Sequence, residues 1–416
     1  IERIKRFDDP LKKQALQNIF TDSQIALIYG AAGTGKTNLI NYISNLMNNK
    51  RKLFLTKTHT TLQNLKRRIE NPGVDADFVS IDRFTKKVIL ENYDIIFVDE
   101  CSIIDNDTML KFMNKISEDT FVVLAGDVFQ IESINFGNWF FYAKDIIKTN
   151  GANIELINTW RTEDETLKDL WNEVRTKAPL ITEKLAIDGD FSEDIGPNIF
   201  NKSDDEEVVL CLNYDGKFGL NNMNQYFQND NKNGEFVTWK EWGYKIGDPI
   251  IFNDTKRFEL LYNNLKGRIV DIAKTAEYIM FTVDINILLT EADCRSEEIE
   301  FIDIIDDTTR ISFKVFAFDD SAEESEIDKM LTVIPFQIAY AISIHKAQGL
   351  EFNSVKVIIP SSNSEKITHD IFYTAITRAK KKLKIFWSSE TMKMIIEEFS
   401  KEGDKDKSLN IIKSKI

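Results

Sequence analysis

The sequence predicts an α/β protein with a small β-rich insertion. Short apolar runs alternate with helix-like patterns in the first third of the chain, which is typical of a parallel sheet with flanking helices. From about residue 240 to 318 the runs become short and rich in β-branched and aromatic residues, and the first pattern returns after residue 350. The simplest organisation is two α/β domains, the second of which is interrupted by a β module.

Local patterns predict the strands and helices of the first third. Three apolar runs have the length of buried parallel strands: Ile25–Tyr29, Ile95–Val98 and Phe121–Ala125. Helical patterns lie between them, at Leu39–Met47 and Leu62–Ile69. Each strand candidate ends at a polar or glycine-containing junction. Because ligands bind beyond the carboxyl ends of parallel strands, functional residues are expected at these junctions.

Later runs predict the insertion and the return to α/β character. The strand candidates of the β module are Pro249–Phe252, Arg268–Ile272, Tyr278–Val283 and Ile311–Phe316. Those of the closing α/β part are Val355–Ile359 and Leu383–Trp387. We therefore expect a first α/β domain at 1–150, the first part of a second at 151–235, the insertion at 236–330, and the remainder with a C-terminal tail at 331–416.

Composition narrows the class of protein. The 416 residues carry a formal net charge of −14, which argues against wholesale basic binding to nucleic acid, and 43% of them are hydrophobic, enough for ordinary cores. The three cysteines are widely spaced, so we expect a reducing, cytoplasmic compartment and no structural metal. The sequence has no apolar run of 18 residues, so no membrane partner is expected. The chain begins with Ile rather than Met, which fits a piece of a longer protein.

Charge is unevenly distributed along the chain. Residues 151–350 sum to −19, whereas residues 1–100 and 351–416 each sum to +4. The acidic runs, such as Asp204-Asp205-Glu206-Glu207, are most often solvated loops. The alternative is that the middle of the chain repels nucleic acid or meets a basic protein.

A glycine-rich loop follows the first strand candidate. The segment Gly30-Ala31-Ala32-Gly33-Thr34-Gly35-Lys36-Thr37 precedes a helical pattern and has the spacing of a phosphate-binding P-loop. Its backbone N–H groups can surround a polyphosphate, Lys36 can reach the β and γ phosphates, and Thr37 can bind Mg²⁺. ATP and Mg²⁺ are therefore the expected cofactors.

Carboxylates and an amide follow the next two strand candidates. Asp99 and Glu100 end the apolar run Ile95–Val98, where Asp99 suits the Mg²⁺ shell and Glu100 can orient or deprotonate an attacking water. Gln130, after the third run, is a candidate sensor of the γ-phosphate. The alternative for Gln130 is an ordinary Gly-Asp turn.

Two polar clusters lie late in the chain. The first is Ser343-Ile-His345-Lys346-Ala-Gln348-Gly349-Leu-Glu351, and the second, Tyr373-Thr-Ala-Ile-Thr377-Arg378, supplies an arginine. An arginine placed at a γ-phosphate stabilises the charge of the transition state and is worth roughly 10³ or more in rate. Taken alone, Arg378 is more often a surface residue.

Together these motifs resemble the ordered motif set of superfamily 1 helicases, over about residues 11–161 and 331–388. The resemblance implies two RecA-like P-loop domains, and an ATP hydrolase that couples hydrolysis to movement on single-stranded nucleic acid, most simply DNA. By the same resemblance, Gln14 reads adenine, Gly349 and Glu351 contact the nucleotide from the second domain, and Arg161 and Arg378 are the two arginine fingers.

The resemblance also suggests where a nucleic-acid strand binds. Thr58 and His59 follow the second α/β strand and match a motif that contacts the backbone, and His345 with Lys346 matches its counterpart on the second domain. Phe84, in a neighbouring motif, could stack a base, with core packing as the alternative.

Two features bear on direction and unwinding. Residues 245–269 resemble the SH3-like insertion of RecD-type helicases, which move 5′ to 3′, whereas Gly349-Leu-Glu351-Phe resembles the UvrD branch, which moves the other way. About 14 residues separate Phe84 from Asp99, where RecD-type enzymes place a strand-splitting hairpin. We expect an ATP-dependent translocase or helicase on single-stranded DNA, with RNA as an alternative strand. An ATP-gated binding switch, acting on a protein partner or a flanking domain, is the second hypothesis.

Overall fold

The computed structural model describes most of the chain. The described residues are 24–73, 75–87, 92–131, 137–146, 153–179, 181–188, 190–202, 206–253, 257–258, 260–295, 299–317, 330–362, 367–399 and 408–409. They form two compact units, Ile1–Asp194 with Ser361–Ile416, and Ile195–Pro360. Four segments are expected from the sequence, and that division stays a prediction.

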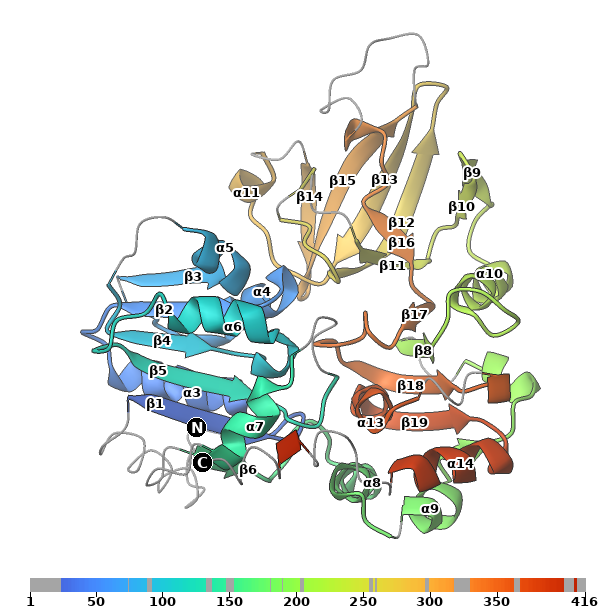
Figure 1. Ribbon diagram of the computed structural model, residues 1–416. Helices are drawn as coiled ribbons and strands as arrows, with labels where there is room; N and C mark the ends of the chain where they lie inside the picture. Colours follow the sequence, from blue (N-terminus) through green and yellow to red (C-terminus); the bar gives the residue numbers. More distant parts are fainter. Residues whose placement is uncertain are drawn as a thin grey trace. The chain divides into compact units, whose positions relative to one another are not determined.

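The N-terminal part of the first unit is built on a six-stranded parallel sheet (Figure 1). Its order is β3 (Ala76–Ser80), β2 (Lys52–Thr56), β4 (Ile95–Val98), β5 (Phe121–Gly126), β1 (Ile25–Gly30) and β6 (Asn153–Leu156). The central strands are buried on both faces, which explains their continuous apolar sequences. The three strands predicted from apolar runs are confirmed.

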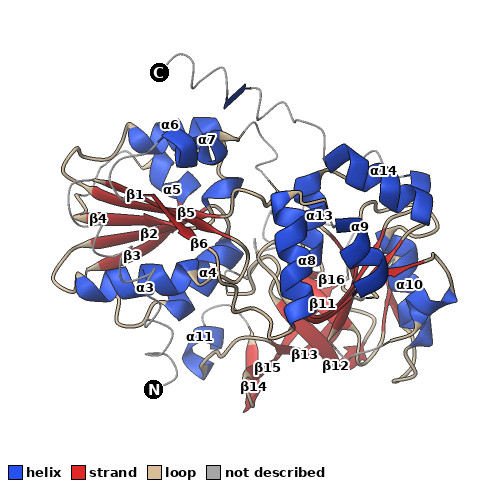
Figure 2. Ribbon diagram, turned by 90° about the horizontal axis from the view of Figure 1, so that it is seen from below, coloured by secondary structure: helices blue, strands red, loops and turns tan. Residues whose placement is uncertain are grey.

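Helices cover both faces of this sheet (Figure 2). They are α3 (Lys36–Leu46), α4 (His59–Arg68), α5 (Ile81–Lys86), α6 (Asn106–Met113) and α7 (Trp139–Ile146). One core contains Phe54, whose ring stacks on Phe78 and Phe97 at 4.6 and 4.9 Å between centroids. The other core contains Leu53, Leu55 and the ring of Phe84.

The rest of the first unit is mainly helical. Its elements are α8 (Glu165–Thr176), α9 (Ile181–Glu183), β7 (Ser192–Glu193), α13 (His369–Ile376), β19 (Ala379–Phe386) and α14 (Ser389–Phe399), with β7 and β19 paired in parallel. The Trp171 indole N–H donates to Ile376 O at 3.1 Å, and His369 Nε2 lies 2.7 Å from Val174 O. These contacts hold α13 against α8, although the two helices are far apart in sequence.

The second unit contains a parallel strand group and a β-rich insertion. The parallel strands are β17 (Ala341–Ser343), β8 (Glu207–Cys211) and β18 (Phe352–Ile358), with α10 (Leu220–Asp230) following β8. The insertion is a six-stranded antiparallel sheet in the order β14 (Glu300–Ile305), β15 (Thr308–Phe316), β13 (Tyr278–Ile285), β12 (Lys266–Lys274), β11 (Pro249–Phe252) and β16 (Phe336–Ile338), beside the hairpin β9 (Val237–Trp239) and β10 (Trp242–Tyr244). The predicted α/β class with a β-rich insertion is confirmed, whereas the SH3-like character of the insertion stays a prediction.

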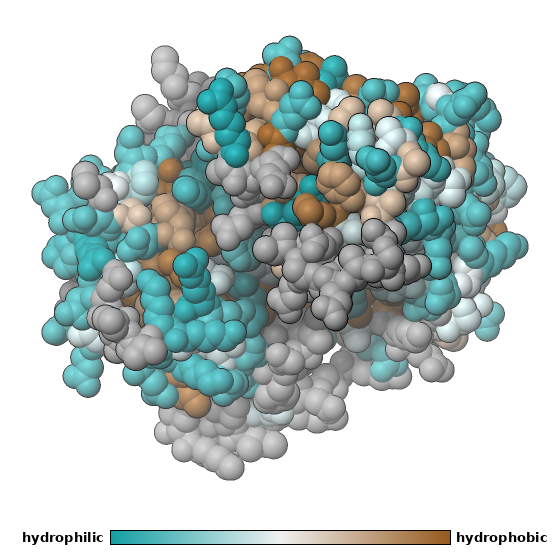
Figure 3. Space-filling model, turned by 90° about the horizontal axis from the view of Figure 1, so that it is seen from above, coloured by the Kyte–Doolittle hydropathy of each residue, from teal (hydrophilic) through white to brown (hydrophobic). Residues whose placement is uncertain are grey.

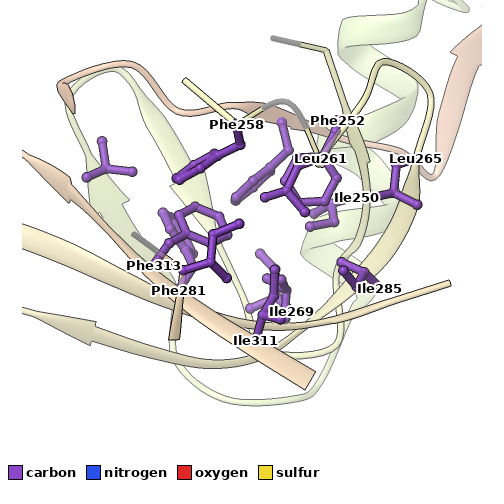
Figure 4. Close-up of a cluster of buried hydrophobic side chains, with 14 of the residues drawn as sticks. Ile250, Phe252, Phe258, Leu261, Leu265, Ile269, Phe281, Ile285, Ile311 and Phe313 are labelled. Carbon is purple, nitrogen blue, oxygen red and sulfur yellow. The ribbon is translucent and has the colours of Figure 1, made fainter. Parts of the chain in front are cut away.

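Aromatic rings fill the core of the insertion (Figure 4). Phe281 meets Phe336 edge to face at 4.9 Å between centroids, and Phe313 lies near both. Such pairs stabilise a core beyond the area they bury. The insertion therefore has a hydrophobic core of its own.

A buried carboxylate ties the start of the insertion to α10. Asp248 is fully buried and accepts hydrogen bonds from Gln228 Nε2 (2.6 Å), Asn231 Nδ2 (2.9 Å) and the Tyr340 hydroxyl (2.9 Å). Since a buried charge is tolerated only where it is hydrogen-bonded, these donors fix the junction between the helix and the β module.

The surface of the described residues mixes polar and apolar groups. On the face in Figure 3, hydrophobic side chains occur among hydrophilic ones. Large exposed apolar residues include Leu288, Ile302 and Ile304 of the insertion. No helix among the described residues is long and apolar enough to cross a membrane.

Candidate functional site

The glycine-rich loop connects β1 to α3, as the sequence predicts. Gly35 precedes α3 with φ +86°, a conformation that favours glycine, and α3 begins at Lys36. Lys36 Nζ donates to Gly30 O at 2.9 Å and to Ala31 O at 3.0 Å, so the ammonium group lies within the loop. The Thr34 hydroxyl donates to Ala31 O at 2.9 Å and tightens the turn. The N-terminus of α3 and the Lys36 ammonium group therefore both lie at the loop, and together they suit a bound phosphate.

A second segment packs directly on the loop. The N–H of Trp160 donates to Gly33 O at 2.8 Å, and the Thr159 hydroxyl donates to Ala32 O at 2.9 Å. A Cβ on Gly33, whose φ is +76°, would lie 2.4 Å from Arg161 Cβ. Gly33 is therefore required both by its backbone conformation and by the close approach of Arg161.

Thr37 and Asp99 meet at the end of β4. The Thr37 hydroxyl donates to Asp99 Oδ2 at 3.0 Å, while Asp99 Oδ1 accepts from the N–H of Glu100 at 2.9 Å. Burial, with a smaller effect of the Glu100 charge, raises the pKa of Asp99 to about 6. A hydroxyl and a buried carboxylate this close offer the hard oxygen ligands that Mg²⁺ prefers.

Glu100 has an unusual backbone conformation. Its φ is +55° and ψ +46°, in the left-handed region that non-glycine residues rarely adopt. Its side chain is partly exposed, unlike that of Asp99. Backbone strain of this kind is found at functional sites. The two adjacent carboxylates also differ in exposure, since Asp99 is buried and Glu100 is half-buried.

The loop after β5 is buried beneath α13. Asp127 is fully buried, Gln130 is 5% exposed, and the N–H of Ile131 donates to the Thr374 hydroxyl at 3.0 Å. The Tyr373 hydroxyl donates to Asp127 Oδ2 at 3.4 Å. Burial raises the pKa of Asp127, and the charge of Lys36 opposes that rise. The Gly-Asp segment is therefore buried, and the role of Gln130 as a sensor of the γ-phosphate stays a prediction.

Arg161 and Arg378 converge on the end of α13. Arg161 Nη1 donates to Thr377 O at 2.8 Å, and Arg378 Nη2 donates to the Thr377 hydroxyl at 3.2 Å. Arg378 is 1% exposed, so the alternative of a surface residue is wrong. The backbone of Arg161 lies against Gly33, which brings one of the two arginines to the glycine-rich loop.

Four further candidates lie in the second compact unit. His345 is exposed, Lys346 Nζ donates to Gln337 Oε1 at 2.6 Å, and burial lowers the pKa of Lys346. Gly349 has φ +79°, and Glu351 O accepts from Lys266 Nζ at 2.6 Å. Gln14, expected to read adenine, lies outside the described residues. The roles of all five stay predictions.

The strand-binding candidates of the first unit divide into two kinds. Thr58 caps α4, where its hydroxyl accepts from the N–H of Thr61 at 3.2 Å, and both Thr58 and His59 are exposed. Phe84 is 4% exposed, and its centroid lies 5.9 Å from that of Phe112 in the core. A ring that is buried in this way cannot stack a base, so the expectation for Phe84 is corrected to core packing.

Some residues of the site have no local signal in the sequence. Lys57 bridges Asp82 (2.9 Å) and Asp105 (3.0 Å), which braces the segment before Thr58. Tyr373 and Thr377 lie inside the motif that predicts a role for Arg378 alone. Their closeness to Arg378 in the sequence could have marked them as candidates. Their roles could not be predicted, because their partners Asp127 and Arg161 are remote in sequence.

The arrangement fits phosphoryl chemistry. The loop can hold a polyphosphate, Thr37 and Asp99 can hold a magnesium ion that neutralises charge, and Glu100 can act on a water. Arg161, which packs on the loop, adds a positive charge. These are the parts that hydrolysis of a nucleoside triphosphate requires.

Two family models match the chain. The AAA domain family matches residues 10–191, and the UvrD-like helicase C-terminal domain matches residues 338–385. The first match contains the loop and the carboxylate pair, and the second contains Thr377 and Arg378.

Curated relatives extend the likeness over most of the chain. The RecBCD enzyme subunit RecD of Buchnera aphidicola subsp. Schizaphis graminum is 24% identical over 91% of this chain and 73% of its own length. An uncharacterized Methanocaldococcus jannaschii protein, MJ1519, is 22% identical over 91% of this chain and 38% of its own length. RecD of Mycolicibacterium smegmatis is 22% identical over 73% of this chain and 52% of its own length. The chain thus spans between about a third and three quarters of these relatives.

Solved structures share the fold. A structure of Pif1 helicases at forked double-stranded DNA has a TM-score of 0.57 and 15% identity, and covers 97% of both chains. Candida albicans Pif1 helicase has a TM-score of 0.55 and 14% identity, covering 97% of this chain and 98% of its own. Together, the family models, the RecD relatives and the Pif1 structures support a RecD-like helicase of superfamily 1. This RecD-like helicase is an ATP-hydrolysing enzyme, and the two RecA-like domains predicted from its motifs are confirmed.

Proposed function

We propose that this helicase couples ATP hydrolysis to movement along single-stranded DNA, with Lys36, Glu100, Gln130, Arg161 and Arg378 as its catalytic set. One observation carries the proposal. Arg161 packs on the glycine-rich loop, and both Arg161 and Arg378 donate hydrogen bonds to Thr377. A simple nucleotide-binding domain has no need of two arginines gathered in this way. An enzyme that must stabilise the charge of a departing phosphate does.

Mg²⁺ is proposed as the metal, with Thr37 and Asp99 as its protein ligands. Their oxygens lie 3.0 Å apart at the end of β4, and burial is the main cause of the raised pKa of Asp99. A bound magnesium ion would neutralise both this carboxylate and the phosphates. Glu100, which is less buried, would then orient the attacking water.

The nucleic-acid strand is proposed to contact the start of α4. Thr58 and His59 are exposed where the N–H groups of a helix N-terminus favour a phosphate. Lys57, directly before Thr58, is held in place by salt bridges to Asp82 and Asp105. Two solved structures of Bacteroides Pif1, which share the fold, contain single-stranded DNA, and that substrate class is proposed here for the same reason.

Direction and unwinding are finer parts of the proposal. We propose movement from 5′ to 3′, because the β-rich insertion follows the RecD-like pattern in sequence. The first unit passes from α5 to β4 through residues 87–94, which is a short connection for a strand-splitting hairpin. Tracking along a single strand is therefore proposed as the main activity, with limited duplex separation.

The test measures ATP hydrolysis by the full chain without nucleic acid, with single-stranded DNA and with single-stranded RNA. We expect DNA to stimulate hydrolysis and Lys36→Ala to abolish it, because the loop then lacks its phosphate-binding ammonium group. Partial duplexes with a 5′ or a 3′ overhang then report direction. Normal strand-stimulated hydrolysis by Lys36→Ala would rule out this site.

An ATP-gated binding switch is the alternative outcome of the same assay. Slow hydrolysis that is unaffected by either strand, with ATP-dependent capture of a protein partner or flanking domain, would replace the motor with the switch. Salt provides a second criterion. Strand affinity should fall steeply with ionic strength because phosphate contacts release counterions. A flat salt dependence would favour the switch.

A further inference from the structure

Thr377 makes hydrogen bonds to both proposed arginine fingers. Its carbonyl oxygen accepts from Arg161 Nη1 at 2.8 Å, and its hydroxyl oxygen accepts from Arg378 Nη2 at 3.2 Å. Thr377 is fully buried, and Arg378 is 1% exposed. Water therefore has little access to the Arg378 guanidinium group, and its orientation depends on protein acceptors, whereas Arg161 is half-buried.

The Thr377 hydroxyl has a fixed orientation. It donates into the preceding turn, to Tyr373 O at 2.9 Å and Thr374 O at 3.1 Å. A hydroxyl whose proton is held in this way presents its lone pairs in a defined direction. Arg378 occupies that direction, and its Nε also donates to Thr374 O at 3.0 Å.

The end of α13 attracts both arginines. The last carbonyl groups of a helix have no partner within the helix and carry a partial negative charge, which favours cationic side chains. α13 ends at Ile376 and Thr377 is its C-cap residue, so the Thr377 carbonyl lies among these groups. Arg161 reaches it from the segment that packs on the glycine-rich loop.

We propose that Thr377 is the positioning residue for both arginines, so that it acts on phosphate transfer through Arg161 and Arg378 without touching the nucleotide. This inference rests on the proposed function. A guanidinium that is displaced by about an ångström loses much of its effect on a transition state, and such displacements can cost about 100-fold in rate. Binding of ATP in the ground state depends far less on the exact position of the guanidinium groups.

The test compares Thr377→Val, which removes the hydroxyl at nearly constant volume, with Thr377→Ser, which restores it. We expect Thr377→Val to lower kcat for ATP by about tenfold or more, while KM for ATP and the affinity for ADP stay within about twofold. The affinity for ADP with aluminium fluoride, which mimics the transferred phosphate, should fall together with kcat. Thr377→Ser should recover most of both.

Thr309→Val is the matched control. Thr309 is fully buried in the insertion, and its hydroxyl donates to Ile287 O at 2.7 Å while accepting from the N–H of Leu289 at 2.9 Å. Loss of the Thr309 hydroxyl should lower the melting temperature about as much as Thr377→Val does, but leave kcat and the affinity for ADP with aluminium fluoride unchanged. Valine keeps the backbone carbonyl that accepts from Arg161, so the effect of Thr377→Val runs through Arg378. A second arm therefore adds Thr377→Val to Arg378→Ala, where it should lower kcat by less than about twofold.

Three results would overturn the proposal. These are an unchanged kcat in Thr377→Val, an equal loss of affinity for ADP and for ADP with aluminium fluoride, or an undiminished effect in the Arg378→Ala background. If the wild-type protein does not hydrolyse ATP, the proposed function fails separately. The comparison of ADP with and without aluminium fluoride then still decides the role of Thr377.

Discussion

The Tyr373 hydroxyl lies 3.4 Å from Asp127 Oδ2, and both side chains are fully buried. This contact joins α13 to the loop after β5, across 246 positions of the sequence. Burial, with a smaller effect of the Asp127 charge, raises the pKa of Tyr373, so the phenol keeps its proton and remains a donor at every physiological pH. The loop that carries Gln130 is therefore attached to α13, the helix that Thr377 caps.

Replacing this tyrosine should weaken the first unit. Tyr373→Phe removes a donor from a buried carboxylate, which we expect to lower the free energy of unfolding by about 1 to 3 kcal/mol. Urea denaturation measures the change. Tyr142→Phe is the control, because the Tyr142 hydroxyl accepts from Asn138 Nδ2 at a partly exposed position. Equal stability of Tyr373→Phe and wild type would show that the contact contributes nothing.

Gly33 should tolerate no side chain. Gly33→Ala places a Cβ 2.4 Å from Arg161 Cβ and 2.8 Å from the Thr159 hydroxyl, so the segment on the loop must move. We expect loss of most ATP binding, measured by calorimetry with ATP or ADP. Gly216→Ala is the control for a general cost of alanine at a glycine with positive φ, because Gly216 lies outside the loop, has φ +98°, and a Cβ added there would meet nothing within 4 Å. If both variants bind nucleotide normally, the close approach is unimportant.

Asp105 should make stability depend on pH. Partial burial would raise its pKa, but the Thr108 N–H and hydroxyl and the Lys57 ammonium outweigh burial and lower the pKa to about 2. Because the folded pKa lies below the unfolded value, the stabilisation is present above about pH 4 and is lost as pH falls toward 2.

Asp105→Asn should therefore cost about 2 kcal/mol at pH 7 and progressively less between about pH 4 and 2. Denaturant titrations of both proteins at several pH values measure this difference. Asp107→Asn, at an exposed position paired with Lys111, serves as the control and should change little. A constant difference between Asp105→Asn and wild type over that whole acidic range would contradict the linkage.

Phe84 should behave as a core residue. Phe84→Leu keeps an apolar side chain in the core and should leave affinity for single-stranded DNA unchanged, whereas Phe84→Ala should cost about 3 to 5 kcal/mol of stability. Fluorescence anisotropy with a labelled oligonucleotide measures the affinity. A base-stacking role would instead appear as weaker binding by folded Phe84→Leu, because leucine offers no aromatic face.

Much of the fold follows from local sequence patterns. The central strands of the first sheet are buried on both faces, so their apolar runs stand out, and the glycine-rich loop has its own spacing. β14 is apolar in sequence as well, but Asp303 interrupts the run and most of its residues are exposed at the edge of the insertion, so neither a continuous run nor an alternation marks it as a strand. The hairpin β9–β10 is too short for a clear alternation.

The sequence by itself determined the chemistry that is local: the loop from Gly30 to Thr37, and the two carboxylates at the end of β4. These motifs work through neighbouring backbone and side-chain atoms, so their spacing specifies them. Only the tertiary structure decided that Phe84 is buried, that Lys57 is paired with two aspartates, and that Arg161 meets Arg378 on Thr377. Such contacts join residues far apart in the chain, and packing of the helices against the sheet, rather than any local pattern, brings them together.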